Sequence, residues 1–198
     1  LTAAGASRVL TMDLHAGQIM GFFNIPVDNL NALPVILPYI RQRWGEEDLT
    51  IVSPDSGGVE RVSEFATRLN NTAMAVIDKR RTSHNKVTDM KVVGEVKNKT
   101  CIIVDDMVDT AGTLVKAGET LLEKGAKRII ACCVHPVLSG TALERINASV
   151  YDEVVITDTI PVPRLHTCRK LKVLSVAPLF AEAIRRIHSD DSVSSLFR

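Results

Sequence analysis

The ten residues from Val104 to Thr113 (VDDMVDTAGT) combine side chains that suit a phosphorylated sugar. Asp105 and Asp106 stand together at the end of an apolar run, where charges are costly unless they face solvent or a partner. Carboxylates in such a place can accept hydrogen bonds from the vicinal hydroxyls of ribose. The next residues are small or hydroxylated where a helix should begin: Asp109, Thr110, Ala111, Gly112 and Thr113. Because a helix N-terminus favours negative charge, this loop could hold a phosphate on its amides and a sugar on its acids.

Helix capping is a simpler interpretation of part of this segment. Asp109 or Thr110 could cap the helix that we expect to start at Gly112. Capping explains one residue but not the pair of carboxylates before it. The fingerprints G-x-x-x-x-G-K-[ST] and G-x-G-x-x-G are both absent, so the sequence holds neither a P-loop nor a dinucleotide-binding motif.

A second candidate segment runs from Lys79 to Lys91 and holds five basic residues against one acidic residue, Asp89. Its low apolar content predicts a mobile loop that closes over a bound substrate. An ordinary solvated run of charge is the alternative interpretation. Lys would act there as a point charge, whereas Arg would act as a two-pronged donor.

Short runs rich in Val and Ile alternate with longer amphipathic patterns along the chain. The runs lack polar alternation, which predicts strands buried on both faces of a parallel sheet: Val9–Leu14, Leu49–Val52, Ala73–Ile77, Cys101–Val104, Ile129–Val134, Val154–Ile156 and Val173–Val176. The patterns with a period of three to four residues predict helices: Leu33–Trp44, Val59–Leu69, Gly112–Glu123, Thr141–Ala148 and Pro178–His188. This order predicts an α/β fold with a doubly wound, mostly parallel sheet. The carboxyl ends of its strands share one edge, and ligands bind beyond that edge.

Composition excludes several classes of protein. The chain has 198 residues and a formal net charge of +1, which argues against a binder of nucleic acid polymers. No apolar run approaches the roughly 20 residues that span a bilayer, so we expect no membrane partner. The four cysteines form no C-x-x-C pair, which predicts reduced core thiols in a reducing compartment rather than a zinc site. The first residues show neither an initiator Met nor a signal peptide, and we interpret the chain as a fragment.

Several segments together carry a family resemblance. Val104–Thr113 resembles the phosphoribosyl diphosphate loop of the phosphoribosyltransferase fold. Asp13–Phe23 (DLHAGQIMGFF) and Pro26–Asp28 resemble a segment special to the ribose-phosphate diphosphokinase family, the phosphoribosyl pyrophosphate synthetases. Other matches to that family are Ser53–Gly58, Asp78–Arg81 and Ser192–Phe197. The resemblance covers essentially all 198 residues, and it implies the C-terminal part of such a protein with a type I phosphoribosyltransferase-like fold.

The resemblance implies a transferase that moves a diphosphate group from ATP to the C1 hydroxyl of ribose 5-phosphate and releases AMP. Such transfers depend mainly on positioning and on neutralising phosphate charge. Lys79 and Arg81 are the implied catalytic residues. The residues implied to bind ribose 5-phosphate are Arg81, Asp105, Asp106, Asp109, Thr110, Ala111, Gly112 and Thr113.

Magnesium is the cofactor that the resemblance implies. His15 and Asp55 match the magnesium-associated positions of the family, and Asp13 is a weaker third candidate. Mg²⁺ prefers oxygen ligands and keeps several waters, so a histidine is an unusual partner for it. A hydrogen-bonded structural role for His15 is therefore the alternative interpretation.

The resemblance also implies a domain organisation. Residues 1–30 are expected to be the remnant of a preceding N-terminal domain, and residues 31–198 to form the phosphoribosyltransferase-like domain. Much of the ATP-binding part would then be missing, and the fragment itself would be inactive. The resemblance implies a homo-oligomer such as a hexamer. It also implies a cytoplasmic location, with an organellar location as the alternative. A catalytically incomplete regulatory or binding subunit of this family, and a phosphoribosyltransferase that consumes the product, are the alternative functions.

Overall fold

A computed structural model describes residues 1–83 and 86–197, with side chains described outside residues 79–89 and 197. Its main sheet has seven strands in the order β5-β4-β3-β6-β7-β8-β9. The bounds are Leu49–Ser53 for β3, Ala73–Ser83 for β4, Lys86–Val93 for β5, Thr100–Val108 for β6, Arg128–Pro136 for β7, Glu153–Thr157 for β8 and Leu171–Leu174 for β9. All neighbours pair in parallel except β4 and β5, which are antiparallel.

Five α-helices accompany the sheet in the described residues. They are α1 (Leu33–Trp44), α2 (Val59–Arg68), α3 (Gly112–Glu123), α4 (Ala142–Ala148) and α5 (Ala177–His188). Short 3₁₀ turns cover Thr2–Ala4, Gly17–Phe22, Ser56–Gly58, Leu165–Thr167 and Ser194–Phe197. No helix in the described part of the chain has the length and apolarity needed to cross a bilayer.

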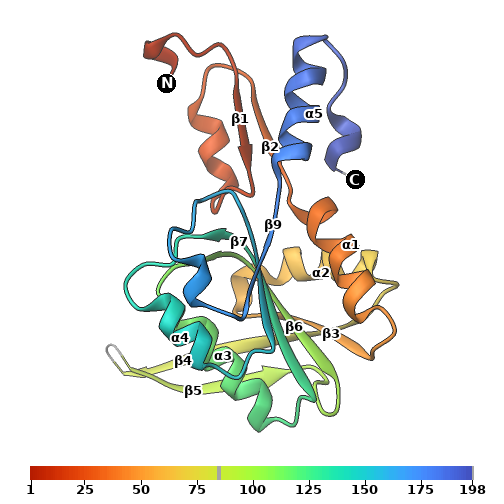
Figure 1. The fold of residues 1–198 in the computed structure, drawn as a ribbon, viewed down its shortest axis with the longest axis vertical. Coiled ribbons are helices and arrows are strands. Elements are labelled where there is room, and N and C mark those ends of the chain that lie inside the picture. The colour runs from red at the N-terminus through yellow and green to blue at the C-terminus, as the bar shows by residue number, and fades with distance from the viewer. Residues whose placement is uncertain (84–85, 198) are drawn as a thin grey trace.

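The central strands are apolar on both faces because each face has its own core. In β6, Ile102 and Val104 pack into the cluster that includes α1 and α2, whereas Cys101 and Ile103 pack into the cluster that includes α3 and α4. The helices lie on the two sides of the sheet accordingly (Figure 1). This arrangement confirms the predicted doubly wound, mostly parallel α/β sheet and explains why its strands show no polar alternation.

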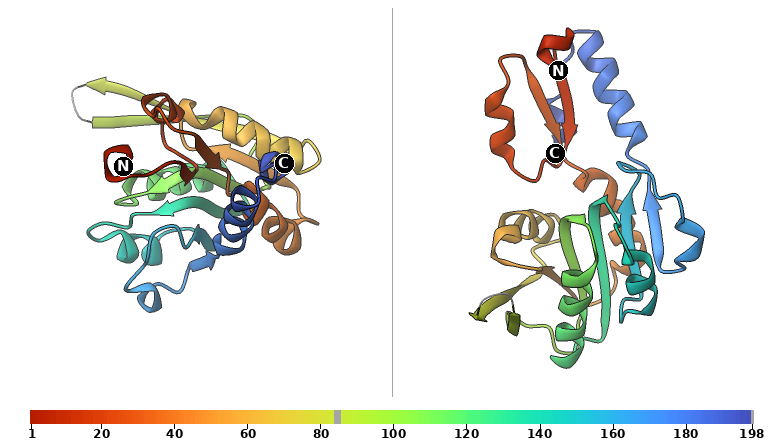
Figure 2. Two further views of the ribbon diagram at one scale, coloured as in Figure 1. Left: turned by 90° about the horizontal axis from the view of Figure 1, so that it is seen from above. Right: turned by 90° about the vertical axis from the view of Figure 1, so that its left-hand side faces the viewer.

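A second, two-stranded sheet lies apart from the main one. Its parallel strands are β1 (Val9–Met12) and β2 (Val27–Leu30), and α5 lies beside them (Figures 1 and 2). Met12 and Leu30 join the core cluster of α1 and α2, so the small sheet is attached to the main body by apolar packing. The proposed division of the chain into residues 1–30 and 31–198 stays a prediction.

Several predicted strand ends differ from those in the structure. The apolar run of β6 ends at Val104, but the strand continues to Val108, so Asp105 and Asp106 belong to the strand rather than follow it. The pairing with β7 runs on to Val108 and Pro136, and those backbone hydrogen bonds extend the strand beyond its apolar residues. Strand β9, by contrast, ends at Leu174, two residues before the predicted end, where its pairing with β8 stops at Thr157.

The predicted loop at Lys79–Lys91 is also wrong. Where the backbone of this segment is described, it forms strands rather than a loop. Strand β4 continues to Ser83, and β5 returns antiparallel from Lys86. Strand β5 forms the edge of the sheet, and charged residues are common on edge strands because they discourage pairing with other chains. A search for apolar runs in the sequence therefore did not predict β5 as a strand. It also missed β2 (VDNL), which is short and half polar.

Candidate functional site

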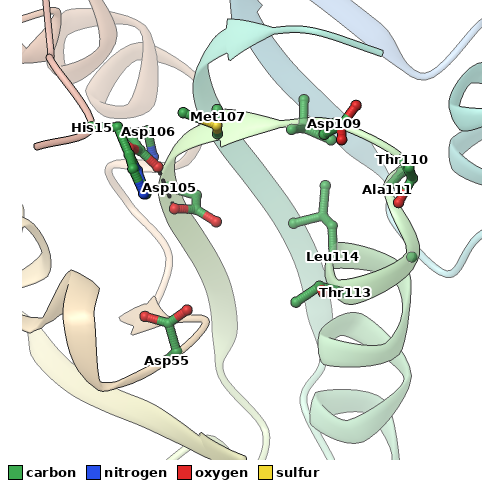
Figure 3. A pocket seen from close by; sticks show the side chains of 12 residues that line it. His15, Asp55, Asp105, Asp106, Met107, Asp109, Thr110, Ala111, Thr113 and Leu114 are labelled. Atoms are coloured by element: carbon green, nitrogen blue, oxygen red, sulfur yellow. Dashed lines mark hydrogen bonds and ion pairs between the residues drawn. The ribbon is translucent and has the colours of Figure 1, made fainter. Parts of the chain in front are cut away.

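A pocket of about 350 Å³ opens where β6 gives way to α3 (Figure 3). The acidic pair Asp105 and Asp106 lies with His15 and Asp55 on one side of the pocket, and residues 109–114 line the opposite side. His15 comes from the segment after β1, and Asp55 comes from the loop after β3. The pocket therefore lies at the carboxyl edge of the sheet, where ligands bind in folds of this class.

Most of the predicted site residues meet in this pocket. Those brought together are His15, Asp55, Asp105, Asp106, Asp109, Thr110, Ala111, Gly112 and Thr113. Asp13 is not among the lining residues: its Oδ2 accepts a hydrogen bond of 2.7 Å from the Ala32 N–H at the start of α1. The side chains of Lys79 and Arg81 lie outside the described residues, so their predicted roles stay predictions.

The two carboxylates of β6 are held by different partners. The Asp106 N–H donates to Asp105 Oδ1 over 2.9 Å, and the Nδ1–H of His15 donates to Asp106 Oδ2 over 2.6 Å. Arg61 Nη1 lies 3.8 Å from both Asp105 Oδ1 and Asp106 Oδ1. A single guanidinium thus faces both acids from the first turn of α2.

Sequence reasoning missed Arg61. The helix Val59–Arg68 was predicted from its apolar stripe, and an arginine outside that stripe would normally face water. One signal was present: Arg61 comes three residues after the Ser53–Gly58 loop, so it stands in the first turn of a helix that begins at the binding edge. Its side chain is 23% exposed and turned toward the acids.

The acidic pair has opposite pKa shifts. Burial, together with the hydrogen bond and the negative charge of Asp106, raises the pKa of Asp105 to about 7. Burial also works against the charge of Asp106, but the hydrogen bonds from His15 and Asp105 and the charge of Arg61 lower its pKa below the usual value. The hydrogen bond to Asp106 raises the pKa of His15. Near neutral pH the pair therefore holds a charged Asp106 and a partly protonated Asp105.

The N-terminus of α3 is left accessible to a ligand. The N-cap residue is Ala111, whose side chain cannot cap, and its backbone is left-handed with φ 59°. Asp109 does not cap the helix: its Oδ1 accepts a hydrogen bond from Ser139 Oγ. The capping interpretation of this segment is therefore wrong. Thr110, Gly112 and Thr113 are exposed, so the amides of the first turn are open to solvent.

Contacts from the β7–α4 region hold the loop that precedes α3. Arg145 Nη1 donates to the Thr110 carbonyl over 2.9 Å, and the Leu138 N–H donates to the Val108 carbonyl over 3.0 Å. A non-glycine residue in left-handed backbone costs roughly 1 kcal/mol or more and persists only where its surroundings hold it. Ala111 is buried in the cluster of α3 and α4, which provides that support.

The described residues contain no group of three or more His, Cys, Asp or Glu side chains arranged to hold a metal ion. Asp55 lines the pocket, and its Oδ1 accepts a hydrogen bond of 3.0 Å from the Gly57 N–H. The His15 ring is bound to Asp106. The oxygens of Asp55, Asp105 and Asp106 suit a hard cation such as Mg²⁺ in kind, although this part of the chain does not enclose a complete ligand set.

Comparisons with known proteins agree with this geometry. The model of the phosphoribosyl synthetase-associated domain matches residues 72–198. A ribose-phosphate pyrophosphokinase from Caldanaerobacter subterraneus subsp. tengcongensis is 55% identical over 197 residues, which cover 100% of this chain and 62% of that protein. A chloroplastic ribose-phosphate pyrophosphokinase 2 from Spinacia oleracea is 48% identical over 199 residues, which cover 100% of this chain and 50% of that protein.

A solved structure supports the same assignment. The phosphoribosylpyrophosphate synthetase from Mycobacterium smegmatis matches with a TM-score of 0.89 and 41% identity, over 96% of this chain and 61% of that one. The chain spans about 62% of the length of the bacterial relative from Caldanaerobacter. The resemblance found in the sequence is thereby confirmed, and the chain belongs to the phosphoribosyl synthetase family, the ribose-phosphate pyrophosphokinases.

Proposed function

We propose that the protein to which this chain belongs transfers a diphosphate group from ATP to the C1 hydroxyl of ribose 5-phosphate. The products are 5-phosphoribosyl 1-diphosphate and AMP, which places the protein in nucleotide biosynthesis. The observation that carries the proposal is one pocket in which the acidic pair of β6 lies opposite the open N-terminus of α3. The names of the relatives agree with it.

The pocket contains two kinds of group that complement ribose 5-phosphate. Asp105 and Asp106 supply carboxylate oxygens, which accept hydrogen bonds from the ribose hydroxyls. The backbone amides of residues 110–113 and the hydroxyls of Thr110 and Thr113 supply donors for the 5-phosphate. Asp109, held by Ser139, braces this loop from the side rather than capping the helix. A sugar phosphate would thus place its two ends on the two walls of the pocket.

Lys79 and Arg81 are the proposed catalytic residues, with Arg81 also facing the ribose 5-phosphate. Strand β4 pairs with β3 as far as Val76 opposite Ser53. Lys79 therefore lies beyond the end of that pairing, on the side of the sheet where the loop with Asp55 begins. Cations there would neutralise the charge that develops on the transferring diphosphate.

Magnesium is proposed as the cofactor. Mg²⁺ is usually held by one or two carboxylates together with substrate phosphates and water, so an incomplete protein ligand set fits it. Asp55, with Asp105 or Asp106, would supply the carboxylates, and His15 would support them through its bond to Asp106. When bound, the ion would neutralise phosphate charge. Asp13 is the weakest candidate, because its carboxylate is occupied by Ala32.

The chain spans about 62% of the relative from Caldanaerobacter, so the activity is proposed for the whole protein and the ribose 5-phosphate site for this chain. A homo-oligomer such as a hexamer and a cytoplasmic location stay proposals.

The test is a coupled assay for AMP formation from ATP and ribose 5-phosphate with magnesium, on this chain and on the longer gene product. In parallel, calorimetry measures the binding of ribose 5-phosphate to this chain. Activity in the longer protein with binding in this chain supports the proposal. Binding without any activity in either protein would indicate a catalytically incomplete subunit, and no binding in either would remove the site.

A further inference from the structure

His135, near the end of β7, contacts the backbone of residues more than a hundred positions earlier in the chain. Its Nε2 lies 3.1 Å from the Met12 carbonyl oxygen and 3.2 Å from the Asp13 carbonyl oxygen. A carbonyl oxygen only accepts hydrogen bonds, so Nε2 carries a proton and shares it between the two. His135 does not line the pocket.

The other ring nitrogen of His135 is also bound. Nδ1 lies 2.9 Å from Thr159 Oγ1, in the segment that follows β8. Thr159 in turn lies within hydrogen-bond distance of the Val134 carbonyl and of Thr157 Oγ1, which donates to the same carbonyl over 2.7 Å. The imidazole is therefore held in one orientation between two separate segments, with its Nε2–H directed at the end of β1.

The segment that receives this hydrogen bond has an unusual backbone. Asp13 is left-handed with φ 42°, its N–H donates to the Leu30 carbonyl over 2.8 Å, and its carboxylate accepts from the Ala32 N–H. Such a backbone persists only where its surroundings hold it. His15 follows two residues later and reaches Asp106 over 2.6 Å. The stretch from Met12 to His15 is thus fastened to the main sheet at both ends, by His135 and by Asp106.

We propose that His135 is a positioning residue of the candidate site: it fixes the Met12 and Asp13 carbonyls against the edge of the sheet so that His15 reaches Asp106. The residue acts through His15 and contacts no ligand. Its effect on ligand binding rests on the proposed function, whereas its effect on His15 does not.

Two amide variants separate the contacts of the ring. In His135→Gln the side-chain amide can reach the position of Nε2, so it can still donate to the two carbonyls. In His135→Asn the amide reaches only the position of Nδ1, so the contact with Thr159 can persist while the contact with the carbonyls is lost. His166→Asn, at an exposed histidine, is the matched control.

The first readout is the pair of ring-nitrogen NMR resonances of His15 at fixed pH, which report the hydrogen bond from Nδ1 to Asp106. We expect His135→Asn to shift them and His135→Gln and His166→Asn to leave them as in the wild type. The second readout is the dissociation constant of ribose 5-phosphate by calorimetry. We expect it to rise about tenfold in His135→Asn, the scale of one lost hydrogen bond.

A double-mutant cycle with His15→Ala distinguishes positioning from general stability. If His135 acts through His15, the loss of affinity from His135→Asn disappears when His15 is already alanine. Additive losses, or unchanged His15 resonances in a folded His135→Asn protein, overturn the proposal. If the wild-type chain binds no ribose 5-phosphate, the proposed function fails, and the His15 resonances alone decide the role of His135. Should His135→Asn fail to fold, a folded His135→Gln with altered His15 resonances still contradicts it.

Discussion

The Nδ1 of His15 lies 2.6 Å from Oδ2 of Asp106 and joins two parts of the chain that are 91 residues apart. This contact connects the segment after β1 to strand β6 at one side of the pocket (Figure 3). It also gives the two neighbouring carboxylates different properties. Asp106 is stabilised in its charged form by His15, whereas Asp105 is half-buried and lies 3.8 Å from the guanidinium of Arg61.

The first prediction concerns stability and pH. The pKa of Asp105 is about 7 in the folded chain and near 3.8 when unfolded, so the unfolded state ionises more readily. The wild type should therefore lose stability as the pH rises from about 4 to about 7. Asp105→Asn removes this charge and should raise the Tm by about 4 °C or more at pH 8, with little change at pH 4. Scanning calorimetry at both pH values checks this, and an equal change at both would contradict it.

The same substitution should weaken the binding of ribose 5-phosphate. Asparagine keeps one acceptor oxygen but replaces the other with a donor, so it cannot accept hydrogen bonds from two vicinal hydroxyls. We expect the dissociation constant to rise about tenfold or more, on the scale of one to two hydrogen bonds to a charged group. Calorimetry at pH 8, where the wild-type carboxylate is ionised, makes the measurement. An unchanged constant would refute the role of Asp105 as the acceptor for the sugar.

The amides at the start of α3 can be tested separately. A Cβ added at Gly112 would lie 3.6 Å from Arg145 Nη1 and 3.7 Å from Thr110 Oγ1, which are ordinary contacts. Gly112→Ala should therefore leave the Tm within about 2 °C of the wild type. The new methyl group would stand where a phosphate approaches the amides, so we expect binding of ribose 5-phosphate to weaken about tenfold. Gly21→Ala, which meets nothing within 4 Å, is the control.

The parts of the fold that follow from apolar patterning were predictable from the sequence. The helices Leu33–Trp44 and Gly112–Glu123 have the predicted bounds because their buried residues recur with the helical period. Strands β2 and β5 were not predictable in this way. They are stabilised by their pairing with β1 and β4, and the local sequence of a strand does not reveal its pairing partner.

The residues of the candidate site were likewise predictable only in part. The acidic pair and the small residues of Val104–Thr113 were identifiable from their types, because the chemistry of a sugar phosphate needs those types. The roles of Arg61 and His135 were not, since each depends on the direction of a side chain relative to a segment that is distant in sequence. Asp13 was assigned from its neighbours in the family segment, whereas its carboxylate binds Ala32 instead of lining the pocket.

A close approach of helix and ring offers a test of the core itself. A Cβ added at Gly118 in α3 would lie 3.0 Å from two carbons of the Tyr151 ring and 3.1 Å from its hydroxyl oxygen. Tyr151 is 1% exposed, and its hydroxyl donates to the Leu114 carbonyl over 2.6 Å, so the ring has little room to move. Gly118→Ala should lower the free energy of unfolding by about 1–3 kcal/mol. Urea unfolding of this variant measures the change, and a stability equal to the wild type would show that the ring adapts.

The last prediction concerns the transfer step and uses the longer gene product. Lys79→Ala should lower kcat by roughly 100-fold or more, the scale of removing one donor to the charge that develops in the transition state. The affinity for ribose 5-phosphate should change much less, because the pocket proposed to bind it is lined mainly by residues of β6 and the start of α3. Lys116→Ala, which removes a lysine from α3 outside the pocket lining, serves as the control. Steady-state kinetics of AMP release, with calorimetry for the sugar phosphate, separate the two effects. A kcat within a few-fold of the wild type would remove Lys79 from the mechanism, whereas a matching loss of affinity would make it a binding residue.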